Sequence, residues 1–167
     1  MSKNADLPFP APFSAYEATV QSDWIDTNGH MNLAYFILIF DRGTAALFNA
    51  LGIEKSYQDS KRCGVFAAET HTLYDHEVLF GERVRVVSQV VGADAKRLHI
   101  AHEMFHLQNG YRVAMEEIMF LHVDLNTRRV VPFLSEAKSA IDAALAAHAG
   151  LRRPQGIGRR VIGLSAA

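Results

Sequence analysis

The feature that most limits how this chain can fold is a long apolar segment, residues 32–51, which has the pattern of one helix. It contains no proline, has Gly43 as its one internal glycine, and ends just before Gly52, a residue type that favours helix C-termini. Some twenty residues at about 1.5 Å each would form a helix of about 30 Å. Residues 33–40 are all apolar or aromatic, so apolar side chains point in every direction around the first two turns. We therefore expect other elements to surround this helix.

Four segments downstream of the helix have the composition of β-strands. The predicted strands are residues 64–74, 82–91, 97–107 and 112–124, and residues 16–21 form a further short strand before the helix. The gaps between the later strands are short, which favours antiparallel neighbours. An alanine-rich segment, residues 134–149, predicts a second helix. This order predicts an α+β fold in which a five-stranded antiparallel sheet wraps a long central helix.

The length and the two ends of the chain suggest a simple domain organisation. We expect a single domain over residues 1–167, because this length is typical of one compact unit. Residues 1–13 contain three prolines and lack the apolar run of a signal peptide, so they are expected to form an extended arm. Residues 150–167 are rich in arginine and glycine and are expected to form a basic tail, either mobile or associated with a dimer interface.

Charge and cysteine content restrict the classes of partner. The formal net charge is -1, from 17 basic and 18 acidic side chains, so there is no overall attraction to nucleic acid or to an anionic membrane. The apolar segments are shorter than the roughly 18 uncharged residues that a membrane span needs. Cys63 is the one cysteine, which excludes a disulfide within the chain and fits a reducing compartment. We expect a cytoplasmic protein without nucleic-acid or membrane partners.

A ten-residue segment lies at the junction between the first predicted strand and the long helix. Residues 23–32, with the sequence DWIDTNGHMN, are followed by Tyr35. This segment resembles the 4-hydroxybenzoyl-CoA thioesterase branch of the hotdog superfamily, whose pattern is Asp, two residues, Gly-His, Val or Met, Asn, and a Tyr soon after. The resemblance extends over residues 16–124. It implies a hotdog fold, hydrolysis of an acyl-CoA without a cofactor or metal, and active sites shared between subunits of a homodimer or a tetramer of dimers.

The chemistry of thioester hydrolysis suggests roles for two positions of this segment. The reaction needs a nucleophile or a base for water, and positive polarisation of the carbonyl oxygen. Asp26 can supply the first, as nucleophile or as general base. Unpaired amides at the start of the helix can supply the second, and the resemblance implies the amide of Leu33. From the residues alone Asp26 could instead be the N-cap of the helix, and the surrounding motif favours the catalytic role.

Other residues of the motif are expected to support the site. Gly29 would allow a positive φ or a close approach of the backbone to the substrate. His30 and Asn32 would contact the substrate or steady the loop. The resemblance places Lys96 and Arg97 at the phosphates of CoA, because phosphate recognition requires basic side chains. Two arginines at positions 128 and 129, or those of the C-terminal tail, are alternatives.

The acyl group is suggested by a polar segment, residues 69–77, with the sequence ETHTLYDHE. Glu69 is the second candidate for a catalytic carboxylate. Together with residues 96–99 and 116–124, this segment is similar to thioesterases of carnitine breakdown, which act on betainyl-CoA and are in some cases fused to carnitine dehydrogenase. A trimethylammonium group would need an aromatic wall and a carboxylate. The candidates for these are Trp24, Tyr35, Tyr74, Glu69 and Glu77, and each aromatic ring could equally belong to the core.

Three other functions have to be weighed against this interpretation. An aromatic or medium-chain acyl-CoA or acyl-carrier-protein thioesterase would use the same motif, and so would a non-catalytic protein that binds acyl-CoA. Residues 102–106, HEMFH, match the H-E-x-x-H pattern of zinc metalloproteases. That pattern requires a helix, whereas these residues fall in a predicted strand, where positions four apart lie about 13 Å from each other. We therefore predict that this segment binds no metal.

Overall fold

The computed structural model describes residues 9–161, so most of the predicted N-terminal arm and the end of the basic tail lie outside the described residues. Five strands, three α-helices and one short 3-10 helix, η1, follow one another along the chain. They are β1 (Phe13–Thr19), η1 (Ser22–Trp24), α1 (Leu33–Ala50), α2 (Lys55–Lys61), β2 (Cys63–Tyr74), β3 (Arg83–Ala93), β4 (Arg97–His106), β5 (Arg112–Asp124) and α3 (Ser135–His148).

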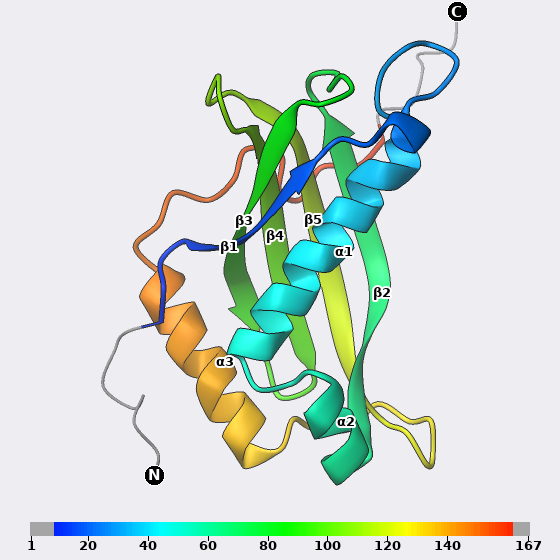
Figure 1. Cartoon of the computed structure of the whole chain (residues 1–167). Helices are drawn as coiled ribbons and strands as arrows, with labels where there is room; N and C mark the ends of the chain where they lie inside the picture. The colour runs from blue at the N-terminus through cyan, green and yellow to red at the C-terminus, as the bar shows by residue number, and fades with distance from the viewer. Residues whose placement is uncertain (1–8, 162–167) are drawn as a thin grey trace, which may run out of the picture.

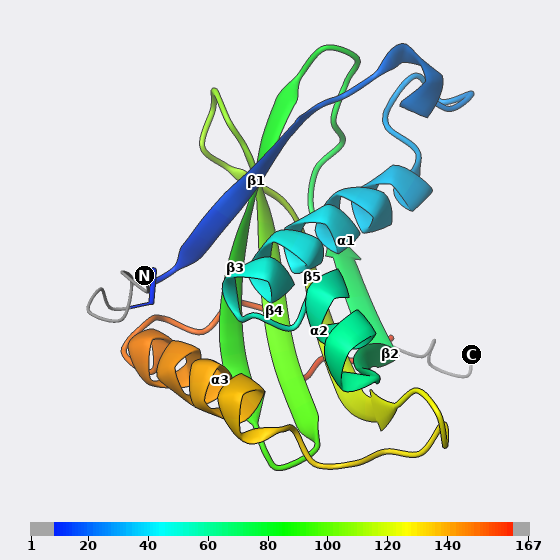
Figure 2. The same cartoon turned by 60° about the horizontal axis from the view of Figure 1, so that its bottom comes forward.

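The strands form one antiparallel sheet in the order β1-β3-β4-β5-β2. Helix α1 lies across one face of this sheet, and α3 packs near the β3 side (Figure 1). Figure 2 shows the curvature of the sheet around α1, with α2 at the far end of the helix. Strands β1 and β2 form the two edges of the sheet. In the sequence, β1 precedes α1, and β2 follows it after α2. The predicted α+β class and the five antiparallel strands are confirmed.

The sheet covers one face of α1. Six residues of the helix are buried, namely Phe36, Ile39, Phe40, Gly43, Thr44 and Leu47. Helix and sheet lie close together at Gly43, where an added Cβ would be 2.6 Å from Cγ1 of Val86 on β3. On the opposite face, Leu33 and Ile37 are 62% and 38% exposed. We expected other elements to surround the helix. Within a single chain they cover one side of it.

By length and composition alone, α1 would qualify as a membrane span, with a mean hydropathy of 1.2 over 18 residues. In this fold it is the helix that packs on the sheet through its buried residues. The apolar segment is explained by that packing, because the side chains on the inner face fill the space between helix and sheet.

Several boundaries differ from those predicted. Strand β1 begins at Phe13 rather than residue 16, because the buried Phe13 pairs with Ser88 of β3 across a register shift. Helix α2 was not predicted, since Tyr57 is its one buried residue and a single apolar position produces no periodicity. Residues 150–161 of the basic tail run along the face of the sheet away from α1, where side chains of the sheet form hydrogen bonds with their backbone.

The segment that matched the zinc pattern is strand β4, as predicted. His102 is completely buried, and its two ring nitrogens bond hydroxyl groups: Nδ1 lies 2.8 Å from Oγ of Ser88 and Nε2 lies 2.9 Å from Oγ1 of Thr44. Burial lowers the pKa of His102 to about 3. Within residues 9–161, no three side chains of the metal-binding types gather at one point. His102 is therefore a core residue that links the sheet to α1.

Candidate active site

The motif forms a compact loop between η1 and α1. An isolated antiparallel bridge joins Ile25 to Met31, and the amide of Asp26 donates to the carbonyl of His30 at 3.0 Å. Inside this bridge the amide of Gly29 donates to the carbonyl of Asp26 at 3.0 Å. Gly29 has φ of 84°, a left-handed conformation that other residues rarely adopt. The structure thus assigns Gly29 to the turn that presents Asp26.

The Asp26 carboxylate is partly buried, with its side chain 20% exposed. The amide of Asn28 donates a hydrogen bond of 2.8 Å to Oδ1 of Asp26. Nδ1 of His30 lies 4.0 Å from the same oxygen and 3.3 Å from the carbonyl oxygen of Met31. These contacts hold one carboxylate oxygen toward the loop, and within residues 9–161 the other oxygen, Oδ2, has no hydrogen-bond donor.

The start of α1 leaves one particular amide unpaired. Asn32 is the N-cap, because its Oδ1 accepts from the amide of Ala34 at 3.0 Å. The amide of Asn32 itself donates to Trp24, and that of Tyr35 donates to the Asn32 carbonyl. Among the described residues, the amide of Leu33 has no acceptor. Asn32 rather than Asp26 therefore caps the helix, and among the described residues the Leu33 amide, which the resemblance implied, is the one left without an acceptor beside those of Asn32 and Ala34.

A cavity of about 400 Å³ opens beside Asp26 and Leu33. Its other wall comes from the end of β2 and the loop after it, residues 74–77. Phe36 of α1 meets Tyr74 of β2 edge to face, with ring centroids 5.2 Å apart and an angle of 86° between the planes. The lining includes four predicted site residues of the motif and of β2, namely Asp26, His30, Leu33 and Tyr74, together with Glu77.

Two predicted aromatic residues lie beside the cavity but do not line it. Trp24 and Tyr35 stack with centroids 5.1 Å apart and planes inclined by 13°. The hydroxyl of Tyr35 donates to the carbonyl of Asp23 at 3.3 Å. This pair of rings joins the loop to the first turn of α1, so it supports the loop that carries Asp26.

Three other predicted site residues lie apart from the cavity within one chain. Glu69 is exposed beside a register shift of β2 and faces a different cavity, shared with His71 and Glu117. Lys96 and Arg97 lie where β4 begins, and Arg97 pairs with Asp94 at 2.6 Å. Arg97 of β4 pairs with Leu121 of β5, which in turn pairs with Phe66 of β2. Arg97 is therefore level with residue 66 of β2, whereas the Asp26 cavity is at residue 74. Eight residues at about 3.3 Å each separate those positions by about 26 Å.

The sequence did not single out Glu116 as a site residue, yet the structure gives it an unusual environment. It lies on β5 between His102 of β4 and Thr72 of β2, and it is 3% exposed. Burial, together with the nearby carboxylate of Asp41 on α1, raises its pKa to about 7. The alternation of residues 112–124 did not mark Glu116, because both sets of alternate positions are largely buried and the set with Glu116 also contains other polar residues.

Known proteins confirm the family suggested by the motif. The model of the thioesterase-like superfamily matches residues 20–141. A betainyl-CoA thioesterase of Pseudomonas aeruginosa is 39% identical over 151 residues, which are 90% of this chain and 94% of that protein. A longer L-carnitine dehydrogenase/betainyl-CoA thioesterase of Rhizobium meliloti is 28% identical, and the match covers 96% of this chain and 32% of that protein.

Solved structures agree on the fold. A Pseudomonas putida protein described as a thioesterase superimposes with a TM-score of 0.79 at 34% identity, covering 95% of this chain and all of that one. A Staphylococcus aureus protein solved in complex with CoA gives a TM-score of 0.86 at 23% identity and covers 97% of this chain and all of that one. The predicted hotdog fold is confirmed, and the chain belongs to the thioesterase-like superfamily.

Proposed function

We propose that this chain hydrolyses betainyl-CoA to betaine and CoA, with Asp26 as the catalytic carboxylate. The choice of substrate rests on the 39% identity with the Pseudomonas aeruginosa betainyl-CoA thioesterase over nearly the whole of both chains. The observation that supports the mechanism is that one cavity is lined by both Asp26 and Leu33, whose amide has no acceptor among the described residues.

The lining of this cavity suits a small cationic acyl group. Tyr74 and Phe36 offer aromatic surface, and the carboxylate residues Asp26 and Glu77 line the same space. A trimethylammonium group is attracted both to the faces of aromatic rings and to negative charge. A long alkyl chain gains nothing from the carboxylates, because burying unpaired charge next to it has a free-energy cost.

The proposed reaction follows from the two groups at the cavity. The thioester oxygen accepts a hydrogen bond from the Leu33 amide, at the positive end of the α1 dipole, which stabilises the negative charge that develops on it. Asp26 either takes a proton from the attacking water or attacks the carbonyl carbon itself. In both routes the C–S bond breaks and CoA leaves as the thiol. Direct attack forms a mixed anhydride with Asp26 as the CoA thiolate leaves, and water then cleaves that anhydride. After a single turnover in ¹⁸O-water, ¹⁸O in the Asp26 carboxylate therefore identifies direct attack, because the general-base route puts no label there.

The substrate assignment is tested by comparing esters that differ in one property. Betainyl-CoA and 3,3-dimethylbutanoyl-CoA have the same shape, but the second replaces the charged nitrogen with carbon. After correction for their different rates of alkaline hydrolysis, we expect betainyl-CoA to have a kcat/KM larger by roughly tenfold or more. Benzoyl-CoA and octanoyl-CoA complete the panel. Rapid turnover of either of these with none of betainyl-CoA would overturn the assignment.

We also propose that the functional unit is a homodimer or a tetramer of dimers. The edge strand β2 has an exposed central part, residues 66–70, and Phe66 there is 42% exposed. Leu33 and Ile37 expose apolar surface on the neighbouring helix. In such an assembly Glu69, Lys96 and Arg97 of a second copy would be available to the Asp26 cavity. Sedimentation velocity checks the proposal, and a monomer at assay concentrations would refute it.

A cytoplasmic location is part of the same proposal. The one cysteine, Cys63, is buried and unpaired, which fits a reducing compartment. Fractionation of the native host followed by detection with an antibody would test it.

A further inference from the structure

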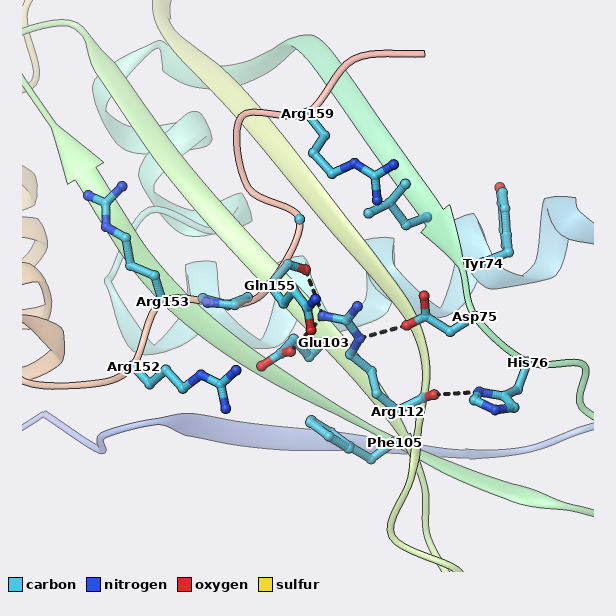
Figure 3. A pocket seen from close by; sticks show the side chains of 13 residues that line it. Tyr74, Asp75, His76, Glu103, Phe105, Arg112, Arg152, Arg153, Gln155 and Arg159 are labelled. Atoms are coloured by element: carbon cyan, nitrogen blue, oxygen red, sulfur yellow. Dashed lines mark hydrogen bonds and ion pairs between the residues drawn. The ribbon is translucent and has the colours of Figure 1, made fainter. Parts of the chain in front are cut away.

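A second and larger cavity, of about 770 Å³, lies on the face of the sheet away from α1 (Figure 3). Its floor comes from the ends of β2, β4 and β5, and its far wall comes from residues 152–159 of the C-terminal segment. The volume is within the range of about 300–1,000 Å³ that is usual for ligand sites. Nothing in the proposed hydrolysis by Asp26 uses this cavity.

The wall formed by residues 152–159 is fixed to the sheet. Four hydrogen bonds hold it: Gln89 Nε2 to the Arg152 carbonyl at 3.1 Å, Arg153 to the Val91 carbonyl at 3.0 Å, Arg112 to the Gln155 carbonyl at 2.8 Å, and the Gly158 amide to Oε2 of Glu117 at 2.6 Å. Gly156 has φ of 109°, and an added Cβ would lie 2.5 Å from Cδ1 of Leu73. The cavity is therefore bounded by an ordered segment that packs closely against β2.

The charges around this cavity do not cancel. Arg112 is neutralised by two carboxylates, since its Nε donates to Asp75 at 2.7 Å and its Nη1 to Glu103 at 3.0 Å. The lining also contains three further arginines, at positions 152, 153 and 159. Among the described residues, none of these three has a carboxylate within ion-pair distance. The cavity consequently carries an excess of positive charge that is available to an anionic ligand.

The position of this cavity indicates which anion it would receive. Tyr74, Asp75 and His76, at the end of β2 and just beyond it, line both this cavity and the one that contains Asp26. A ligand whose reacting end lies at Asp26 can therefore pass around the end of β2 and place its other end among the arginines. Guanidinium groups bind phosphate oxygens in bidentate geometry. Phe105 on the floor offers an apolar surface to a base.

We propose that this arginine-lined cavity binds the phosphates of the CoA nucleotide, with Arg152 and Arg159 as the principal contacts. The proposal rests on the proposed acyl-CoA substrate but not on the identity of the acyl group. In this proposal the basic tail binds the substrate within its own chain. The proposal is an alternative to binding of these phosphates by Lys96 and Arg97, which within one chain lie at the opposite end of the sheet and would have to come from a second copy.

The test is the double variant Arg152→Gln with Arg159→Gln. Neither side chain makes a hydrogen bond to another described residue, so the variant should unfold at the wild-type temperature. Titration calorimetry with CoA should show affinity lower by roughly tenfold or more, because two charge-assisted contacts are lost. The KM for the acyl-CoA should rise with kcat unchanged. The KM for the matching acyl-pantetheine, which lacks the nucleotide, should not change.

Two further double variants provide the control and the rival. Arg128→Gln with Arg129→Gln removes the same charge from a turn outside the cavity. These arginines are an alternative site for the CoA phosphates, so the proposal requires that this variant bind CoA as the wild type does. Lys96→Gln with Arg97→Gln tests the rival location. Unchanged CoA affinity in the Arg152 and Arg159 variant would overturn the proposal, and so would a loss confined to the Lys96 and Arg97 variant.

Binding of CoA also separates this inference from the proposed function. If betainyl-CoA is not hydrolysed but the Arg152 and Arg159 variant binds CoA weakly, the substrate is wrong and the nucleotide site stands. Competition by 3′,5′-ADP should be much stronger than competition by inorganic phosphate. Equal competition by the two would show a general anion site and would contradict the assignment to the CoA nucleotide.

Discussion

The backbone amide of Asn28 donates a hydrogen bond of 2.8 Å to Oδ1 of Asp26, so Oδ2 is the oxygen free to act on a substrate. Because the donor belongs to the same loop, the carboxylate is positioned before any substrate binds. The bridge between Ile25 and Met31 closes this loop at its base. The geometry of the proposed catalytic carboxylate thus depends on a short local structure that the sheet and α1 hold in place.

Replacing Asp26 with Asn should abolish most of the activity while preserving the structure. The amide oxygen of Asn can still accept from Asn28, but it is a poor base and a poor nucleophile, so kcat should fall by roughly 10²–10⁴-fold. Steady-state thiol release measures this, and CoA affinity should be unchanged. The control is Asp23→Asn, which removes a neighbouring exposed carboxylate. Wild-type kcat in the Asp26 variant would contradict the assignment.

The role of the Leu33 amide can be tested by Leu33→Pro. Leu33 is the first residue of α1, a position where proline is well tolerated, and Asn32 before it has φ of -62° and ψ of 143°, which suits a residue preceding proline. Loss of this one donor should raise the barrier by about 2.7–4 kcal/mol, as for other oxyanion donors. Leu33→Ala keeps the amide and should keep kcat. Equal rates in the two variants would exclude the amide from catalysis.

Gly43→Ala should destabilise the protein, although helix propensity predicts the opposite. Alanine in a helix interior is favoured over glycine by about 1 kcal/mol. Here the added Cβ would lie 2.6 Å from Cγ1 of Val86, and such overpacking costs about 1–3 kcal/mol. Urea unfolding measures the difference. The double variant with Val86→Ala should recover part of the loss, and a stabilised Gly43→Ala would show that α1 can shift away from β3.

The raised pKa of Glu116, about 7, predicts a pH dependence of stability. Burial and the Asp41 carboxylate favour the protonated form in the folded state, so folding binds a proton between pH 4.5 and pH 7. The stabilising contribution is complete below pH 4.5 and is lost as pH rises through 7, with an upper limit of about 3 kcal/mol. Glu116→Gln should remove this loss. His102 acts in the opposite direction as pH falls through 6.5 toward 3, so the difference between variant and wild type isolates Glu116.

One series of unfolding measurements compares the pH dependence of stability in Glu116→Gln and in the wild type. Free energies of unfolding from urea titrations at pH 5, 6, 7 and 8 should converge for Glu116→Gln and wild type at low pH and diverge at high pH, with the variant more stable. Parallel curves would mean that Glu116 does not change its protonation between these values.

Local sequence determined the elements and the motif. The apolar run before Gly52 predicted α1, the alternating segments predicted β2 to β5 within one or two residues, and the residues around Asp26 indicated the family. These features depend on neighbours a few positions apart, because helices and strands repeat every 3.6 and 2 residues. Helix α2 and the start of β1 escaped prediction because each is defined by contacts with distant segments.

Tertiary structure alone decided which predicted residues meet. The hydrogen bond from the Met31 amide to the Val78 carbonyl ties the motif loop to the segment after β2, so that Asp26 and Tyr74 line one cavity. The register of β2 with β5 and of β5 with β4 carries Lys96 and Arg97 to the other end of the sheet. The capping geometry of Asn32 selects Leu33 as the one amide left unpaired at the start of α1 among the described residues. Such relations arise from strand pairing and packing between segments far apart in the sequence. No local pattern encodes them, because the same periodicities are compatible with other registers.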